Sequence, residues 1–265
     1  MQELRVHQVR IEPVESVPED HGPVLGEGEP MVAVQRLSHN FGSHWALKDV
    51  SFTLGKGEFL FLFGPSGAGK TTLLRILHAA LPLTRGLAMV AGFDLRKLSR
   101  SDVPRLRRSV SVVFQDFKIM PERSVAENVA LPLEVRGMAR AQIQRRVRAV
   151  LRSLELEHKS GCACATLSGG EQQRVAIARA IVVNPKVILA DEPTGNLDHD
   201  LSVRLMEVFS QFHQFGATII VATHDRSLLS IPKSAQVLEL AGGQLGACAP
   251  DLAPDLAAQM AEDRL

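Results

Sequence analysis

Short apolar runs alternate with amphipathic segments through the middle of the chain. Four runs are apolar at nearly every position and end in polar residues: Glu58–Phe63, Val110–Phe114, Lys186–Ala190 and Ala217–Ala222. Runs that are apolar on both faces are typical of central strands in a sheet that helices cover. The first run leads into a Gly-rich turn and then into a helical pattern over Lys70–Leu81. This alternation predicts an α/β fold.

The segment from about residue 116 to 179 has a different pattern, with few strand signals. Apolar residues recur there at helical spacing, whereas arginines fall on the other faces. The apolar set is Ile143, Val147, Leu151 and Leu154, and the arginines are Arg145, Arg146, Arg148 and Arg152. The pattern predicts a helical subdomain, over about 116–179, inserted into the α/β core.

The two ends differ from the body in composition and charge. Residues 1–30 mix Pro, Gly and Glu without a period and predict a mobile arm, and residues 249–265 predict a flexible tail. The arm carries seven acidic and two basic residues and the tail four and one, which leaves residues 31–248 at +9 in a chain of net charge +1. A basic body suits a polyphosphate ligand, an anionic membrane surface or nucleic acid, and charge alone does not choose among them.

Composition argues against several classes of protein. Of the 265 residues, 45% are hydrophobic and 22% are charged, which is not the composition of a disordered chain. No apolar stretch approaches the roughly 18 residues needed to cross a bilayer, and the first residues lack the apolar centre of a secretory signal. Three cysteines do not provide a disulfide framework, so we expect a reducing compartment.

A phosphate-binding motif lies between the first apolar run and the helical pattern that follows it. Residues 64–71 read GPSGAGKT and match G-x-x-x-x-G-K-[ST]. Its glycines let successive backbone N–H groups face one anion, and the helix N-terminus adds partial positive charge. We expect Lys70 to reach the β- and γ-phosphates and the Thr71 hydroxyl to ligate Mg²⁺. The nucleotide-binding residues predicted in this segment are Gly64, Pro65, Ser66, Gly67, Ala68, Gly69, Lys70, Thr71 and Thr72.

Two adjacent acids follow the apolar run at 186–190. A carboxylate at the C-terminal end of a strand lies at the edge where α/β sheets bind ligands. We expect Asp191 to hold Mg²⁺ and Glu192 to polarise the attacking water as a general base. Alone, the pair fits a solvated turn equally well. Beside a phosphate loop it indicates hydrolysis of a nucleoside triphosphate.

Residues 167–172 read LSGGEQ and indicate a second anion site at a helix start. Ser168 can cap a helix that begins near Gly170, and good helix formers follow. A capped helix accounts for the serine. It does not account for the consecutive glycines Gly169 and Gly170, where alanine would stabilise the helix more.

With these elements in this order, the chain resembles the nucleotide-binding domains of ATP-binding-cassette (ABC) transporters from about Val32 to Leu245. The resemblance implies a P-loop NTPase fold: an ABC-type ATPase core with the inserted helical subdomain and a small antiparallel β subdomain. It implies ATP and Mg²⁺ as ligands. The residues implied around the metal are Thr71, Gln115 and Asp191, and those implied in catalysis are Glu192, His224 and Gln115.

The resemblance also implies a homodimer in which each subunit completes the site of the other. The residues that would close over the partner's ATP are Ser168, Gly169 and Gly170, and Asp198 would cross the interface. Three implied residues also have plainer explanations. Gln115 fits the polar end of a strand, His224 fits a structural hydrogen-bonding group, and Asp198 fits the cap of the next helix.

Members of this family usually stack adenine on a tyrosine upstream of the phosphate loop, but this chain contains no tyrosine. Phe41 occupies the matching place and offers an aromatic face. Trp45 is a less well aligned candidate, and packing in the core is an equal alternative for Phe41.

The segment after Gln115, DFKIMPERSVAENVALPL, resembles the cassette subunits of bacterial cell-division complexes. That resemblance implies a peripheral protein on the cytoplasmic face of the inner membrane, which acts on a membrane partner and through it on cell-wall hydrolases. In the family this region docks on the partner. The apolar patch expected to receive a short partner helix is Phe117, Ile119, Met120 and Pro121. Packing under the helical subdomain is the alternative explanation.

Two other functions stay open at this point. A lipoprotein-release or macrolide-efflux cassette has nearly identical motifs. A cassette ATPase that handles nucleic acid would use a basic cluster formed by Arg96, Lys97, Arg100, Arg105, Arg107 and Arg108. Translation factors of that kind carry two cassettes and repair ATPases carry long insertions, so we expect no nucleic-acid partner.

Overall fold

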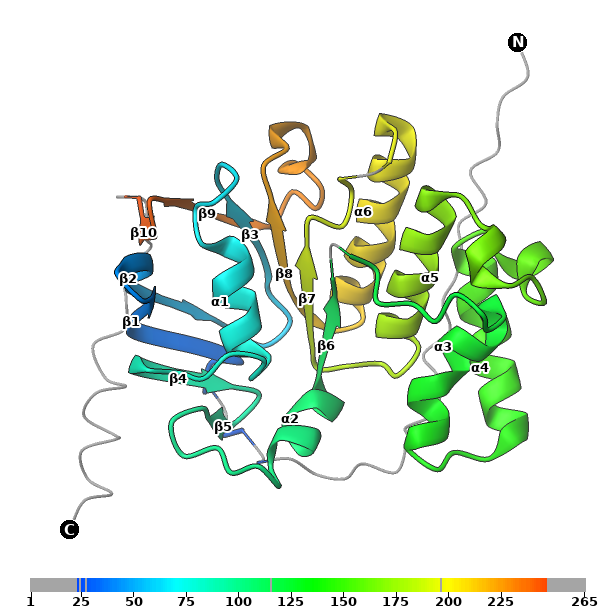
Figure 1. Ribbon diagram of the computed structural model, residues 1–265, viewed down its shortest axis with the longest axis horizontal. Helices are drawn as coiled ribbons and strands as arrows, with labels where there is room; N and C mark the ends of the chain where they lie inside the picture. Colours follow the sequence, from blue (N-terminus) through cyan, green and yellow to red (C-terminus); the bar gives the residue numbers. More distant parts are fainter. Residues whose placement is uncertain (1–22, 24, 27, 115, 196, 247–265) are drawn as a thin grey trace.

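Two sheets organise the chain in the computed structural model, which describes residues 23, 25, 26, 28–114, 116–195 and 197–246 (Figure 1). The larger sheet has six strands in the order β10-β9-β3-β8-β7-β6. All neighbours are parallel except β10, which runs antiparallel to β9. The strands are β3 (Phe59–Phe63), β6 (Val110–Val113), β7 (Val187–Asp191), β8 (Thr218–Thr223), β9 (Gln236–Ala241) and β10 (Gln244–Leu245).

The smaller sheet is antiparallel, with the order β2-β1-β4-β5. Its strands are β1 (Val32–Phe41), β2 (His44–Leu54), β4 (Arg85–Val90) and β5 (Phe93–Asp94). Phe41 pairs with His44 where β1 turns into β2. Phe41 therefore lies at the end of a hairpin.

The central strands bury both faces, as their continuous apolar runs predict. Along β3, Leu60 and Leu62 face one hydrophobic cluster, whereas Phe59 and Phe61 face the other. Side chains alternate between the two faces of a strand, so each cluster receives every second residue. The cluster with Leu60 joins the larger sheet to helix α1 (Lys70–Leu77) and the smaller sheet. The cluster with Phe59 joins it to α5 (Gly169–Ile181) and α6 (His199–Gln214).

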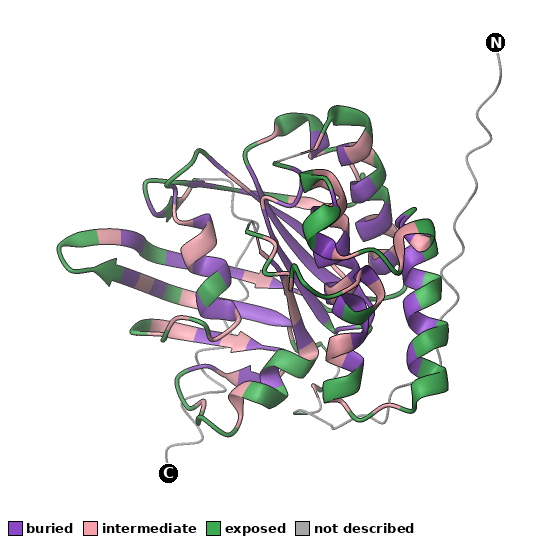
Figure 2. Cartoon of the chain, turned by 45° about the vertical axis from the view of Figure 1, so that its right-hand side comes forward, coloured by how far each residue is buried: buried purple, intermediate pink, exposed green. Residues whose placement is uncertain are grey.

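Helices cover the face of the larger sheet that points away from the smaller sheet (Figures 1 and 2). The remaining helices are α2 (Val103–Ser109), α3 (Val125–Val135), α4 (Arg140–Ser153), α5 (Gly169–Ile181) and α6 (His199–Gln214), with short 3₁₀ turns η1 (Glu157–Lys159), η2 (Cys164–Thr166) and η3 (Arg226–Leu228). Helices α3, α4 and α5 pack on one another. None of the helices in the described part of the chain has the length and apolar character that a bilayer crossing requires.

The strand predictions and the predicted fold are confirmed, and two details are wrong. The helix expected over Lys70–Leu81 ends at Leu77, and Ala79 just beyond it takes a left-handed φ of 53°. Arg146, expected to face away from the apolar stripe, is only 4% exposed. Residues 1–22, 24, 27 and 247–265 lie outside the described residues, so the predicted arm (1–30), body (31–248) and tail (249–265) stay predictions.

Candidate nucleotide-binding and hydrolysis site

Three neighbouring strands place the predicted catalytic and binding residues at one edge of the larger sheet. Strands β3, β8 and β7 are adjacent and parallel, so their C-terminal ends meet. β3 leads into the phosphate loop, β7 ends at Asp191 and β8 leads into His224. The carboxyl edge of an open parallel sheet is where α/β proteins bind ligands.

The phosphate loop needs glycine where its backbone passes close to other strands. Gly69 has a φ of 106°, and a Cβ there would lie 2.4 Å from the carbonyl oxygen of Ala46 in β2. A Cβ on Gly64 would lie 2.0 Å from the carbonyl oxygen of Leu240 in β9. Any side chain at either position would displace backbone, so both glycines are required by the fold.

Lys70 is the first residue of α1, and its side chain is buried beneath the loop, 5% exposed. Its Nζ donates to the carbonyl oxygens of Gly64 at 2.6 Å and Pro65 at 3.1 Å. The same Nζ lies 3.2 Å from Oε1 of Glu192. A fixed ammonium group is therefore bonded to the loop that would cradle phosphate.

Glu192 lies between two groups of the site. Its Oε2 lies 2.9 Å from Nδ1 of His224, opposite the contact of Oε1 with Lys70. Glu192 has a left-handed φ of 47°, a conformation that non-glycine residues seldom adopt and that clusters at functional sites. Its N–H donates to the carbonyl oxygen of Ala222, which fixes this turn against β8. The acid predicted as the general base is therefore held at the sheet edge.

Thr71 and Asp191 are brought together although they are far apart in sequence. The Thr71 hydroxyl donates to Oδ1 of Asp191 at 3.1 Å. Burial raises the pKa of the Asp191 carboxyl, and the Thr71 hydrogen bond opposes that rise. A hydroxyl and a carboxylate are oxygen ligands of the kind Mg²⁺ takes beside phosphate. The donor set therefore fits the predicted metal. Gln115, the third predicted ligand, lies outside the described residues.

The predicted signature segment begins a helix, as expected. Ser168 is the N-cap of α5, and it forms a capping box with Glu171 in which each side chain accepts from the other's backbone N–H. Gly170 is tightly packed, since a Cβ there would lie 3.1 Å from Leu197 Cδ2. Gly169 is different, because a Cβ there would meet no described atom within 4 Å. The fold does not require glycine at 169.

The two aromatic candidates for stacking on adenine differ in their surroundings. Phe41 is 52% exposed, with its ring in a T-shaped contact with that of His39, which argues against the core-packing alternative. Trp45 is already covered by the guanidinium of Arg85, 5.2 Å from its ring centre. The Phe41 hairpin is continuous with Ala46, which touches the phosphate loop at Gly69.

Side chains from α3 and α5 hold the backbone of the predicted docking patch by hydrogen bonds. Phe117 and Lys118 both have left-handed backbones, with φ of 56° and 51°. Arg179 of α5 donates to their carbonyl oxygens, at 2.9 Å for Phe117 and 2.6 Å for Lys118. Asn128 of α3 bonds both the N–H and the carbonyl oxygen of Met120. The sequence reasoning did not identify Arg179 or Asn128.

Side-chain packing divides the patch. Ile119 packs against the core, which fits the alternative explanation for that residue, and Phe117 and Met120 are half-buried. Pro121 is exposed. Asp198 caps α6 by accepting from the N–H of Leu201 at 2.8 Å, as its plainer explanation has it, and a further role at an interface stays a prediction.

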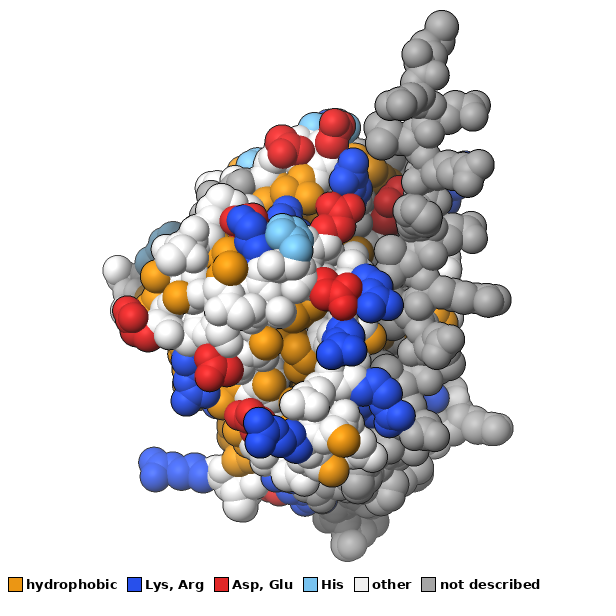
Figure 3. Space-filling model, turned by 90° about the vertical axis from the view of Figure 1, so that its right-hand side faces the viewer, with side chains coloured by type: hydrophobic (Ala, Val, Ile, Leu, Met, Phe, Trp, Pro, Cys, Tyr) orange, Lys and Arg blue, Asp and Glu red, His pale blue; other side chains and the backbone are white. Residues whose placement is uncertain are grey.

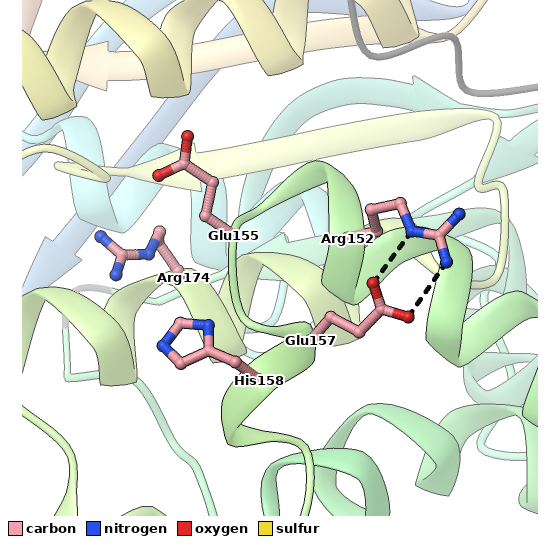
Figure 4. Close-up of a pocket in the computed structure, with 5 residues that line it drawn as sticks. All are labelled: Arg152, Glu155, Glu157, His158 and Arg174. Atoms are coloured by element: carbon pink, nitrogen blue, oxygen red, sulfur yellow. Dashed lines mark hydrogen bonds and ion pairs between the residues drawn. The ribbon is translucent and has the colours of Figure 1, made fainter. Parts of the chain in front are cut away.

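Two cavities lie away from the sheet edge, in the helical part. One, of about 590 Å³, is lined by charged groups, of which Arg152 and Glu157 bind each other through two hydrogen bonds (Figure 4). The other, of about 800 Å³, lies between α3 and α4. Figure 3 shows hydrophobic side chains reaching the surface on this side of the molecule, among charged ones. Neither cavity includes a residue of the phosphate loop.

The phosphate loop, the hydroxyl–carboxylate pair and the glutamate lie together at the carboxyl edge of a parallel sheet, which is the arrangement of a P-loop nucleoside triphosphatase. The model of the ABC transporter family matches residues 47–195. The chain belongs to the ABC transporter family, and its fold and motifs make it an ABC-type ATPase, as predicted.

Within the ABC transporter family, the chain is similar to a particular group of proteins. Proteins named cell division ATP-binding protein FtsE are 50% identical over 185 residues in Streptococcus pneumoniae, 44% over 188 in Bacillus subtilis and 42% over 216 in Escherichia coli. These matches cover 70%, 71% and 81% of this chain and 80%, 82% and 97% of the relatives. The predicted resemblance to cell-division cassettes is confirmed.

Solved structures agree with the fold. Two dimeric structures of the ABC transporter cassette MJ0796, one in a post-hydrolysis state bound to ADP and Pi, match with a TM-score of 0.75 and 32% identity. Each match covers 81% of this chain and 96% of the other. This chain is therefore similar to cassettes that form dimers.

Proposed function

We propose that the chain is the ATP-hydrolysing subunit of a membrane complex of the FtsE–FtsX kind, which acts in bacterial cell division. It would work as a homodimer on the cytoplasmic face of the inner membrane, with ATP and Mg²⁺ as ligands. One observation carries the proposal: Glu192 is held between Lys70 of the phosphate loop and His224, beside Asp191. The similarity to FtsE proteins supports the division role.

Binding of ATP follows from the loop and its buried lysine. The backbone N–H groups of residues 66–72 would surround the phosphates, and Lys70 would turn its ammonium from the loop carbonyls to the β- and γ-phosphates. Thr71, Asp191 and Gln115 would hold Mg²⁺. The ion would offset negative charge on the phosphate oxygens.

Hydrolysis would be attack of water on the γ-phosphorus. As the new P–O bond forms, the bond from that phosphorus to the bridging oxygen breaks, which gives ADP and phosphate. Glu192 would accept the proton of the water, Gln115 would help to orient it, and His224 would contact the γ-phosphate. The contact of His224 with Glu192 supports a shared task.

The signature segment would act on the ATP of the partner subunit. Gly169 supports this, because nothing within the described chain requires glycine there and glycine weakens a helix start. A ligand approaching from outside does supply a reason for glycine. Ser168 and Gly170 would contact the same triphosphate, and Asp198 would lie at the interface.

Phe41→Ala is expected to raise the KM for ATP by roughly 10-fold, since stacking of a base on an aromatic ring is worth about 1–3 kcal/mol. Trp45→Ala is the matched control and should change KM less, because Arg85 already covers that ring. Steady-state ATPase kinetics measure both. A larger increase in KM for Trp45→Ala than for Phe41→Ala would show that adenine stacks on Trp45 instead.

Phe117→Asn is expected to weaken binding of the membrane partner while leaving ATP affinity unchanged. Asparagine tolerates the left-handed backbone at this position, so the change removes the ring without adding strain. Val135→Asn on α3 is the control, since Val135 is 73% exposed and outside the patch. Pull-down from detergent extracts measures the difference. Equal recovery of the partner with both variants would contradict docking at Phe117.

The identity of the copurifying membrane protein tests the proposed role. A partner with four spanning helices and a large extracytoplasmic loop between the first two would support the division complex. A partner that sorts lipoproteins or exports macrolides would contradict it.

A further inference from the structure

The segment proposed to approach a triphosphate contains an acid. Glu171 follows Gly170 directly, on the first turn of α5. If this segment approaches a triphosphate, a carboxylate on it would bring charge of the same sign, which would disfavour closure of a dimer around ATP. The chain therefore needs a way to tolerate this charge.

Lys159 supplies the opposite charge at contact distance. Its Nζ lies 2.5 Å from Oε1 of Glu171, while Oε2 of the same carboxylate accepts from the N–H of Ser168 at 2.8 Å and its hydroxyl at 3.0 Å. The glutamate side chain is 16% exposed and that of the lysine 33%. Both carboxylate oxygens are thus held, and the pair has no net charge.

The pKa of Glu171 agrees with this arrangement. The Lys159 bond lowers it most, together with the N–H of Ser168, to about 2. The acid therefore stays ionised at every pH at which the protein would work. Protonation of Glu171 therefore does not remove its repulsion of a triphosphate, and the positive charge of Lys159 is left to offset it.

Lys159 is held by the helical subdomain. It is the last residue of η1, and the segment that follows is bonded to the first turn of α3. The N–H of Ala126 donates to the carbonyl oxygen of Ser160 at 2.9 Å, and that of Val125 to Cys162 at 3.0 Å. Figure 4 shows the residues just before Lys159, with Glu157 bound to Arg152 of α4. The backbone next to Lys159 is thus bonded to α3, in addition to the pair that its side chain makes with Glu171.

We propose that Lys159 is a positioning residue that neutralises Glu171 and holds it in the capping box, so that Ser168 and Gly169 can approach a triphosphate bound to the partner subunit. This inference rests on the proposed function, because it requires closure of two copies around ATP. It assigns a task to a residue outside the signature segment.

The test measures ATP-dependent dimerisation by analytical ultracentrifugation, with Glu192→Gln as the parent so that ATP is not consumed. Lys159→Met is expected to weaken the dimer roughly tenfold, and less at high salt, where the uncompensated charge is screened. Glu171→Gln should stay close to the parent, because glutamine also completes a capping box. Adding Glu171→Gln to Lys159→Met should restore the dimer, since no charge then remains to be neutralised.

Three results would overturn the proposal. If the double variant is as weak as Lys159→Met, the lysine acts only as a structural support. If Lys159→Met dimerises like the parent, it has no role. If Lys159→Met loses ATP binding as a monomer, the defect lies in the phosphate loop.

A parent that shows no ATP-dependent dimer would overturn the proposed function itself, and this inference with it. Melting curves verify folding of each variant. Lys159→Gln is a second charge-free change with the same expected defect and rescue, and Lys159→Arg should behave as the parent.

Discussion

Glu192→Gln is expected to lower ATP turnover by about 100- to 10,000-fold, the range that a general base contributes, while ATP still binds. The amide has the same shape: its oxygen can still accept from Lys70 and its NH₂ group can donate to Nδ1 of His224, the two groups that contact the wild-type carboxylate. It cannot take a proton from water. Phosphate release measures turnover, and a fluorescent ATP analogue measures binding.

Glu207→Gln is the matched control for this change. Glu207 is an exposed acid on α6, so the Glu207→Gln protein should hydrolyse ATP at the wild-type rate. Turnover by Glu192→Gln at the wild-type rate would show that Glu192 is not the base. Loss of ATP binding in that variant would show instead that the carboxylate maintains the loop.

Lys70→Ala is expected to weaken ATP binding by roughly 100-fold or more and to abolish measurable turnover. The ammonium group would make charge-assisted hydrogen bonds to two phosphates, each worth about 1.5–3 kcal/mol. Among the residues that the structure describes, its hydrogen bonds and ion pair are to two loop carbonyls and Glu192. Titration calorimetry with ATP-Mg²⁺ measures the loss.

Lys97→Ala serves as the control, because Lys97 is an exposed lysine far along the chain from the loop. It should bind ATP like the wild type. Melting curves show whether Lys70→Ala is folded. A folded Lys70→Ala chain with unchanged ATP affinity would remove the phosphate-loop assignment.

The sequence allowed the sheet and most of the hydrolysis site to be predicted. Each central strand is a continuous apolar run, and the groups that matter lie at the C-terminal end of a strand or shortly after it, so Lys70, Asp191 and His224 could be placed at one edge. Their spacing along the chain carries that information. The contact between Thr71 and Asp191 forms because β3 and β7 run parallel on either side of β8.

What escaped prediction depends on the backbone or on long-range hydrogen bonds. The left-handed conformations of Glu192, Phe117 and Ala79 have no signal in residue type, because left-handed positions usually favour glycine or asparagine. Arg179 and Asn128 look like ordinary helix residues, yet both bind backbone groups of the docking segment. The sequence predicted that Ser168 caps a helix, whereas the capping box with Glu171 and the position of Lys159 were found only from the fold.

The central claim is that two copies close around ATP, each completing the site of the other. Native mass spectrometry of Glu192→Gln with ATP and Mg²⁺ tests it most directly. We predict a species of two chains with two ATP. Adding Gly169→Asp should leave single chains with one ATP each, because that position has room for a side chain within its own subunit and the new charge would face the partner's phosphates. Single chains of the Glu192→Gln parent, saturated with ATP at every protein concentration, would contradict the claim.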